Sequence, residues 1–110
     1  MSCTSQTYNL PCHTSGDTFD GVQFSVLLNS VAVNLTGAIM VMKVYDNYKK
    51  NVLTINSGAG ITTLNATGGV FQIDAQRILL AAQIYFYEIE IIFVDLSVKT
   101  YIKGTWTISQ

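Results

Sequence analysis

The first candidate for a chemically active side chain is His13, the single histidine of the sequence. A nucleophile activated by histidine, or a histidine-based metal site, would have to use this side chain. Cys12 and Asp17 lie near it in the sequence, so a Cys/His/Asp grouping is conceivable. A loop histidine is the simpler interpretation, and two ligands without a second Cys/His pair do not make a zinc signature. We therefore predict neither a catalytic residue nor a metal site here.

Acidic side chains provide two further candidates. Glu88 and Glu90 stand two residues apart on one strand face, which resembles the carboxylate pair of a glycosidase. The neighbouring strand offers lysines, so an ion-paired outer face explains both acids. Asp17 and Asp20 could bind calcium with loop carbonyls, yet they lack the dense oxygen ligands of a calcium loop. We expect a protein that is not an enzyme and that holds no metal and no cofactor.

The remaining short motifs are typical of structure. Glycines within residues 58–60 and 68–69 do not open an apolar helix after a strand, so hairpin glycines are favoured over a phosphate cradle. The glycosylation motifs at Asn34 and Asn65 matter only in a secretory pathway. Three aromatic side chains could stack on sugars or on a partner protein, namely Tyr45, Tyr48 and Tyr101.

A strand-rich chain must position these side chains, and its clearest element is a hairpin within residues 83–108. Its first strand is apolar at every second position, which predicts one buried face, at Tyr85, Tyr87, Ile89, Ile91 and Phe93. Its second strand offers a matching core series, made of Val98, Thr100, Ile102, Gly104, Trp106 and Ile108. Burial of Trp106 and its neighbours should be the main stabilising term, at about 1.5–3 kcal/mol per large side chain.

The loop length sets the register of this hairpin. A two-residue loop places Ile89 opposite Ile102, Tyr85 opposite Trp106 and Glu88 opposite Lys103. A four-residue loop instead places Glu90 opposite Lys103. Either register sets an acid against a base on the outer face.

The rest of the chain reads as short strands between turns. Residues 1–7 form a polar arm, expected to be ordered only when docked. Residues 8–12 suit an edge strand that tolerates Pro11. Further strands are expected at residues 22–28 and 31–33, which form a hairpin through a turn at 29–30, and at residues 38–46, 52–55, 61–64 and 70–73. The strand at 38–46 is apolar on both faces, which predicts a central position.

One helical turn is expected at residues 74–81, where Asp74 can cap it while Ile78 and Leu79 point inward. The predicted fold class is therefore all-β: one antiparallel β-sandwich domain over residues 1–110, jelly-roll or immunoglobulin-like, with about eight or nine strands.

Composition narrows the function. The chain has 110 residues, of which 12% are charged, and a formal net charge of −1. This balance predicts no attraction to nucleic acid or to membranes, and near-neutral charge favours association with partners. The first residues lack a signal-peptide pattern, so we expect folding in a cytoplasm, with Cys3 and Cys12 as free thiols.

Four segments carry a family resemblance when they are taken together. They are residues 16–24, which begin with Gly16, Asp17, Thr18 and Phe19; residues 35–42, which begin with Leu35, Thr36 and Gly37; the pair Tyr85 and Tyr87; and residues 99–108, which include Thr100, Tyr101, Gly104 and Trp106. In this order they resemble the N-terminal domain of the phage baseplate upper protein family and related small bacteriophage tail proteins. The resemblance covers nearly the whole chain.

That resemblance implies a non-enzymatic virion structural module that anchors larger tail or baseplate parts through protein–protein contacts. Its partners would be other virion proteins, with a homo-oligomer in the particle, assembled in the host cytoplasm. It supplies no catalytic residue. A capsid-attached accessory protein and a carbohydrate- or surface-binding sandwich remain alternatives, the latter favoured by the outward tyrosines.

Overall fold

The computed structural model describes residues 6–28 and 31–110, apart from the side chains of Gln6, Leu28 and Tyr101. Every regular element in the described part of the chain is a strand. The strands are β1 Gln6–Thr7, β2 Leu10–Thr14, β3 Thr18–Phe19, β4 Val22–Ser25, β5 Leu27–Leu28, β6 Val31–Ala32, β7 Ile39–Tyr45, β8 Asn51–Ser57, β9 Gly60–Asn65, β10 Val70–Ile73, β11 Gln76–Arg77, β12 Gln83–Ile92 and β13 Val98–Ser109. The predicted all-β class is confirmed.

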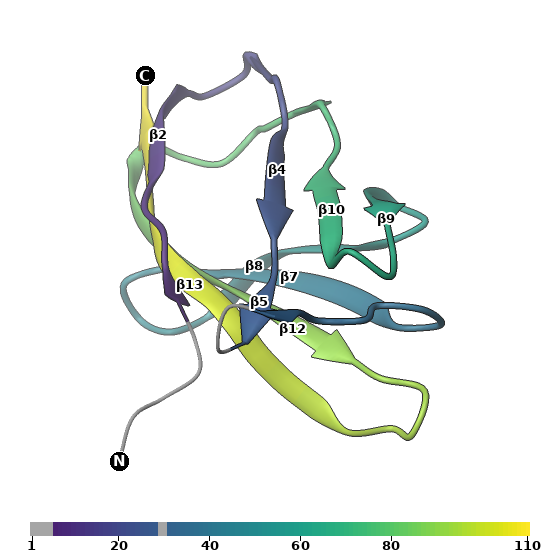
Figure 1. The fold of residues 1–110 in the computed structure, drawn as a ribbon. Helices are drawn as coiled ribbons and strands as arrows, with labels where there is room; N and C mark the ends of the chain where they lie inside the picture. Colours follow the sequence, from purple (N-terminus) through teal and green to yellow (C-terminus); the bar gives the residue numbers. More distant parts are fainter. Residues whose placement is uncertain (1–5, 29–30) are drawn as a thin grey trace.

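Most strands belong to one curled sheet (Figure 1). Its order is β1-β13-β12-β7-β8-β9-β10-β4, and β2 also pairs with β13. The curl brings the two ends of this order together, because the ring of Tyr8, between β1 and β2, lies edge-on against Phe24 of β4 at 5.6 Å. The short strands form two small ladders, β11 with β3 and β5 with β6.

The sheet is mixed, so the prediction of a purely antiparallel fold is wrong in two places. Strands β1 and β2 run parallel to β13, and β8 runs parallel to β9. The central position predicted for residues 38–46 is confirmed, since β7 pairs with β12 on one side and β8 on the other. Edge placement of the segment with Pro11 is also confirmed.

A single apolar cluster fills the interior of the curl. The alternation along β12 places Tyr85, Tyr87, Ile89 and Ile91 in this cluster, as predicted. Trp106 of β13 is fully buried among them, and its ring contacts Phe19 edge-on at 5.1 Å. Burial of these large side chains is the main stabilising term of the hairpin.

The hairpin register follows the prediction made for a two-residue loop from Gln83 to Ile89, which covers seven of its ten residue pairs. Ile89 lies opposite Ile102, Tyr85 opposite Trp106 and Glu88 opposite Lys103. The register then shifts by one residue between Ile89 and Glu90, so that Glu90 faces Thr100 and Ile92 faces Val98. The connection runs over residues 93–97, longer than either loop considered from the sequence.

This shift turns the side chains at the start of β13, next to the loop, onto the other face of the sheet. Val98 and Thr100 were expected in the core, and that expectation is wrong. Val98 is 55% exposed and shares the outer face with Ile92 and Ile39. A one-residue irregularity inverts every side chain beyond it, because side chains alternate with a period of two.

The helical turn expected at residues 74–81 is not present. Residues Gln76–Arg77 form β11, which pairs with β3, and the N–H of Ile78 donates to the carbonyl of Asp17 at 3.3 Å. Long-range backbone partners thus replace the local bonds of a helix. Ile78 is buried as predicted, whereas Leu79 points outward.

Two N-terminal predictions are confirmed in part. The hairpin predicted around residues 29–30 forms at its turn end, where β5 pairs antiparallel with β6 and the N–H of Val33 donates to the carbonyl of Val26 at 2.9 Å. The first half of the predicted strand, β4, pairs with β10 instead. Residues 6–7 of the predicted arm form β1 against β13, while residues 1–5 and the turn at 29–30 lie outside the described residues. Within the described residues, no helix is long and apolar enough to span a membrane.

Candidate functional site

The candidate site is built on the outward-facing positions of β12. Since Tyr85 and Tyr87 point into the core, Phe86 between them must point outward, and it is 49% exposed. The register sets Phe86 beside Tyr45 of β7 and beside Thr105 of β13. Two aromatic residues therefore lie side by side on the outer face of the sheet, within β12 and at the end of β7.

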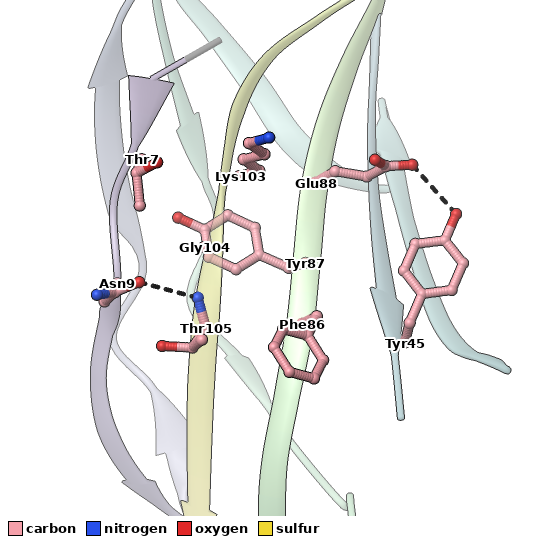
Figure 2. Close-up of a pocket in the computed structure, with 9 residues that line it drawn as sticks. All are labelled: Thr7, Asn9, Tyr45, Phe86, Tyr87, Glu88, Lys103, Gly104 and Thr105. Carbon is pink, nitrogen blue, oxygen red and sulfur yellow. Dashed lines mark hydrogen bonds between the residues drawn. The ribbon is translucent and has the colours of Figure 1, made fainter. Parts of the chain in front are cut away.

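Two adjoining hollows meet at this pair, and Figure 2 shows the first of them. Both are lined by Tyr45, Phe86 and Glu88. The first, of about 310 Å³, is completed by Thr7, Asn9, Tyr87, Lys103, Gly104 and Thr105. The second, of about 550 Å³, is completed by Asp46, Asn47 and Lys49. We call the two hollows together the sheet-face groove.

The wall of the first hollow depends on Gly104. A Cβ at this position would collide with the carbonyl of Tyr8, so only glycine lets the segment between β1 and β2 lie this close to β13. That carbonyl accepts a hydrogen bond from the phenol of Tyr87. The side-chain oxygen of Asn9 accepts another from the N–H of Thr105 at 3.1 Å (Figure 2). These bonds fix the edge of the groove.

Polar groups in the groove are fixed in the same way. The phenol of Tyr45 donates to one oxygen of Glu88 at 3.2 Å, shown as a dashed line in Figure 2. Burial raises the pKa of Tyr45, and the nearby carboxylate of Glu88 raises it further. The phenol therefore stays protonated and serves as a hydrogen-bond donor.

Glu88 and Glu90, the acid pair suggested by the sequence, each interact with a different side chain. Glu90 forms an ion pair with Lys43, whose Nζ lies 3.2 Å from the carboxylate oxygen. The hydrogen bond that Lys43 donates to Glu90, and then the charge of Glu90, raise the pKa of Lys43. Glu88 is held by Tyr45 instead, and it stands in register with Lys103 without forming an ion pair within the described residues. The two acids therefore do not present a shared catalytic geometry.

The side chain of His13, considered from the sequence as part of a Cys/His/Asp grouping, makes packing contacts in the structure. Its Nε2 donates to the backbone carbonyl of Asp17 at 3.0 Å, and its ring packs edge-on against Phe19 at 5.8 Å. Cys12 is an exposed free thiol on the adjacent position. Both residues line a hollow of about 300 Å³ beside Asp20, but the described residues contain no group of three or more His, Cys, Asp or Glu suited to a metal.

The residues that carried the family resemblance are spread over turns and core. Gly16 and Gly37 adopt positive φ angles of 88° and 72° in turns, with Asp17 and Thr36 beside them. Buried positions hold Phe19, Leu35, Tyr85, Tyr87 and Trp106. Thr18 begins β3, Thr100 faces outward opposite Glu90, and Tyr101 has no described side chain. Of this set, Tyr87 and Gly104 alone line the sheet-face groove.

Sequence reasoning missed the centre of the groove. It did not single out Phe86, although a large apolar residue at an outward position of a strand is itself a signal. Tyr45 was named as an outward aromatic, and this is where it lies. Tyr48 is 90% exposed but does not line either hollow. Asn9 and Thr105 help to line the groove because the segment between β1 and β2 lies against β13. The sequence gives no local signal for that placement.

Comparisons with known proteins give a likeness at the level of the fold alone. No protein-family model matches the chain, and no curated protein matches it either. Among solved structures, it is similar to CopC from Methylosinus trichosporium OB3b, with a TM-score of 0.50 and 14% identity over 88% of this chain and 82% of that chain. At this identity the likeness shows the fold alone.

This likeness corrects the function expected from the sequence. The prediction of a phage tail, baseplate or capsid-attached structural protein is contradicted, because the fold behind it is shared with CopC and no comparison gives a link to a phage protein. The physical reason lies in the motifs themselves. Turn glycines such as Gly37 and core residues such as Trp106 specify β structure, and a fold does not by itself specify a role.

Proposed function

We propose that this chain is a non-enzymatic binding module whose ligand site is the sheet-face groove. The observation that carries the proposal is the exposure of Phe86, with 49% of the residue open to solvent at the point where the two hollows meet. Binding sites combine a concave apolar surface with a few fixed polar groups. Phe86 and Tyr45 supply the apolar surface, and Asn9 and Glu88 supply fixed polar groups.

The engagement of the nearby acids supports a role in binding rather than in catalysis. A general base must be free to reach the proton that it removes. One oxygen of Glu88 is occupied by Tyr45, and Glu90 is paired with Lys43. The groove is therefore better suited to holding a ligand than to transforming one.

Amide chemical shifts of the ¹⁵N-labelled protein provide the test. A mixed library of small molecules, sugars and short peptides is added to the wild-type protein and to the variant Phe86→Thr. Ile84→Thr is the matched control, because Ile84 lies outward on the same strand, is 50% exposed and does not line the groove. Threonine suits a strand, so both variants should fold.

We expect some of these ligands to change the amide chemical shifts of Phe86, Glu88 and Thr105 in the wild-type protein and in Ile84→Thr. The same ligands should lose most of their effect on Phe86→Thr. Ligands that shift only other surfaces, or that bind Phe86→Thr equally well, would overturn it.

A further inference from the structure

The sheet-face groove runs across the strands. It begins at Thr7 and Asn9 on the sheet edge, crosses β13, β12 and β7, and ends at Asn47 and Lys49 in the turn after β7. Neighbouring strands lie about 4.8 Å apart, so the crossing from β1 to β7 spans about 15 Å. A polyproline II segment rises about 3.1 Å per residue, so about five residues would fill this length.

The charges along the groove balance. Asp46 and Glu88 contribute two acids, and Lys49 and Lys103 contribute two bases. A groove with equal numbers of acids and bases offers little net attraction to a strongly acidic or strongly basic ligand. The occupant that matches it best is neutral.

Hydrogen-bonding capacity narrows the choice further. Each amide and carboxylate lining the groove already makes a structural hydrogen bond. Asn9 accepts from Thr105, Asn47 donates to Gln83, Asp46 accepts from two backbone N–H groups of its turn, and Glu88 accepts from Tyr45. Within the described residues, the side-chain ammonium groups of Lys49 and Lys103 make none. The charged side chains of the groove that hold no partner at all in the described part of the chain are therefore donors.

A proline-rich segment suits these properties. Prolines lack the N–H, so such a segment presents mainly carbonyl acceptors, which lysine donors can meet. Its rings pack into aromatic-lined grooves, and the extended conformation is largely formed before binding. A sugar chain would instead rely on amides and carboxylates for its many hydroxyls, and each of these groups already holds a structural partner here.

We infer that the ligand of the sheet-face groove is a neutral, proline-rich segment of a partner protein, bound across the strands in the polyproline II conformation. This inference rests on the proposed function, since it names the ligand class of the same site. Phe86 and Tyr45 hold the prolyl rings, while Lys103 and Lys49 donate to carbonyls toward the two ends.

The test titrates the ¹⁵N-labelled protein with a capped peptide of repeating Pro-Pro-Ala. Comparison ligands are a capped Gly-Ser peptide of equal length and a cello-oligosaccharide. The expected result is saturable movement of the amides of Phe86, Glu88 and Thr105 with the proline peptide alone. Phe86→Thr should weaken binding at least about tenfold, as expected for a central aromatic anchor, and Ile84→Thr should leave it unchanged.

Two results would overturn the inference. If the Gly-Ser peptide or the oligosaccharide binds the groove as well as the proline peptide does, the ligand class is wrong, while the binding module stands. If no ligand of the three moves these amides, the inference fails, and the library screen decides separately whether the groove binds anything at all.

Discussion

Phe86 of β12 lies directly opposite Tyr45 of β7, and both side chains face away from the core. Their inward neighbours, Tyr85, Tyr87 and Val44, are buried. The same strands therefore carry the core on one face and the sheet-face groove on the other. Substitutions on the outer face can test binding with little effect on folding, and substitutions beneath it can test how the groove is held.

Gly104 should tolerate no side chain. The φ angle at Gly104 lies outside the left-handed region, so an alanine backbone is unstrained there, but its methyl group would collide with the carbonyl of Tyr8. We expect Gly104→Ala to lower the free energy of unfolding by about 1–3 kcal/mol, the usual effect of overpacking. Urea unfolding measures this directly.

The matched control for that variant is Thr105→Ala at the next residue of β13. Its side chain lies on the outer face, so the expected change is within about 0.5 kcal/mol. Equal stability of Gly104→Ala and the wild-type protein would show that the β1–β2 segment can move away from β13 without loss.

Tyr87→Phe should destabilise the fold through a single lost hydrogen bond. The phenol of Tyr87 donates to the carbonyl of Tyr8, and its removal leaves that carbonyl without this partner. The expected loss is about 1–2 kcal/mol in urea unfolding. Tyr45→Phe is the control, because the bond from Tyr45 to Glu88 lies on the outer face and should contribute less. A larger loss for Tyr45→Phe would contradict this ranking.

The same phenol should make stability depend on pH in alkaline solution. Burial raises the pKa of Tyr87 above its ordinary value, and the neighbouring Tyr8 raises it further. The unfolded chain therefore releases this proton first, and the stabilising contribution is fully present below about pH 10 and is lost as the pH rises toward the folded-state pKa. Urea unfolding across the alkaline range should show a steeper fall for the wild-type protein than for Tyr87→Phe. Parallel curves would refute the assignment to Tyr87.

The hairpin shows how far local sequence pattern can predict this fold. Alternation fixed the buried face of β12 and the partners of Ile89 and Tyr85 correctly, because burial of large side chains dominates there. It failed for Val98, because the register shift between Ile89 and Glu90 places Val98 opposite Ile92 on the outer face, and such a shift leaves no signal in the alternation of β12. The pairing of Gln76–Arg77 with β3 was equally invisible, because its partner lies far away in the sequence.

The groove was harder to predict than the fold. Tyr45 could be recognised as outward, but its position opposite Phe86 depends on the register of two strands separated by several turns. Asn9 reaches the site only because β1 and β2 run parallel to β13. Such long-range placement leaves no mark on a local pattern of apolar and polar residues.

Glu90→Gln should have a small and salt-dependent effect. The ion pair between Lys43 and Glu90 is partly open to water, which screens it. We expect a loss below about 1 kcal/mol at low salt, and a smaller one in high salt. A double-mutant cycle with Lys43→Met isolates the pair from other effects. A coupling that is large and unaffected by salt would show that the pair is effectively buried.

Leu96→Gly should stabilise the protein, although it removes a large apolar side chain. Leu96 is 80% exposed at the tip of the β12–β13 hairpin and adopts a φ of 70°, which is strained for a leucine. Glycine adopts this conformation freely, so relief of strain should outweigh the added freedom of the unfolded chain by about 0.5–1 kcal/mol. Val94→Gly in the same loop is the control and should destabilise, because Val94 has no positive φ and lies against Gly37. Thermal unfolding of the two variants gives the comparison, and destabilisation by Leu96→Gly would mean that the exposed leucine makes a stabilising contact in solution.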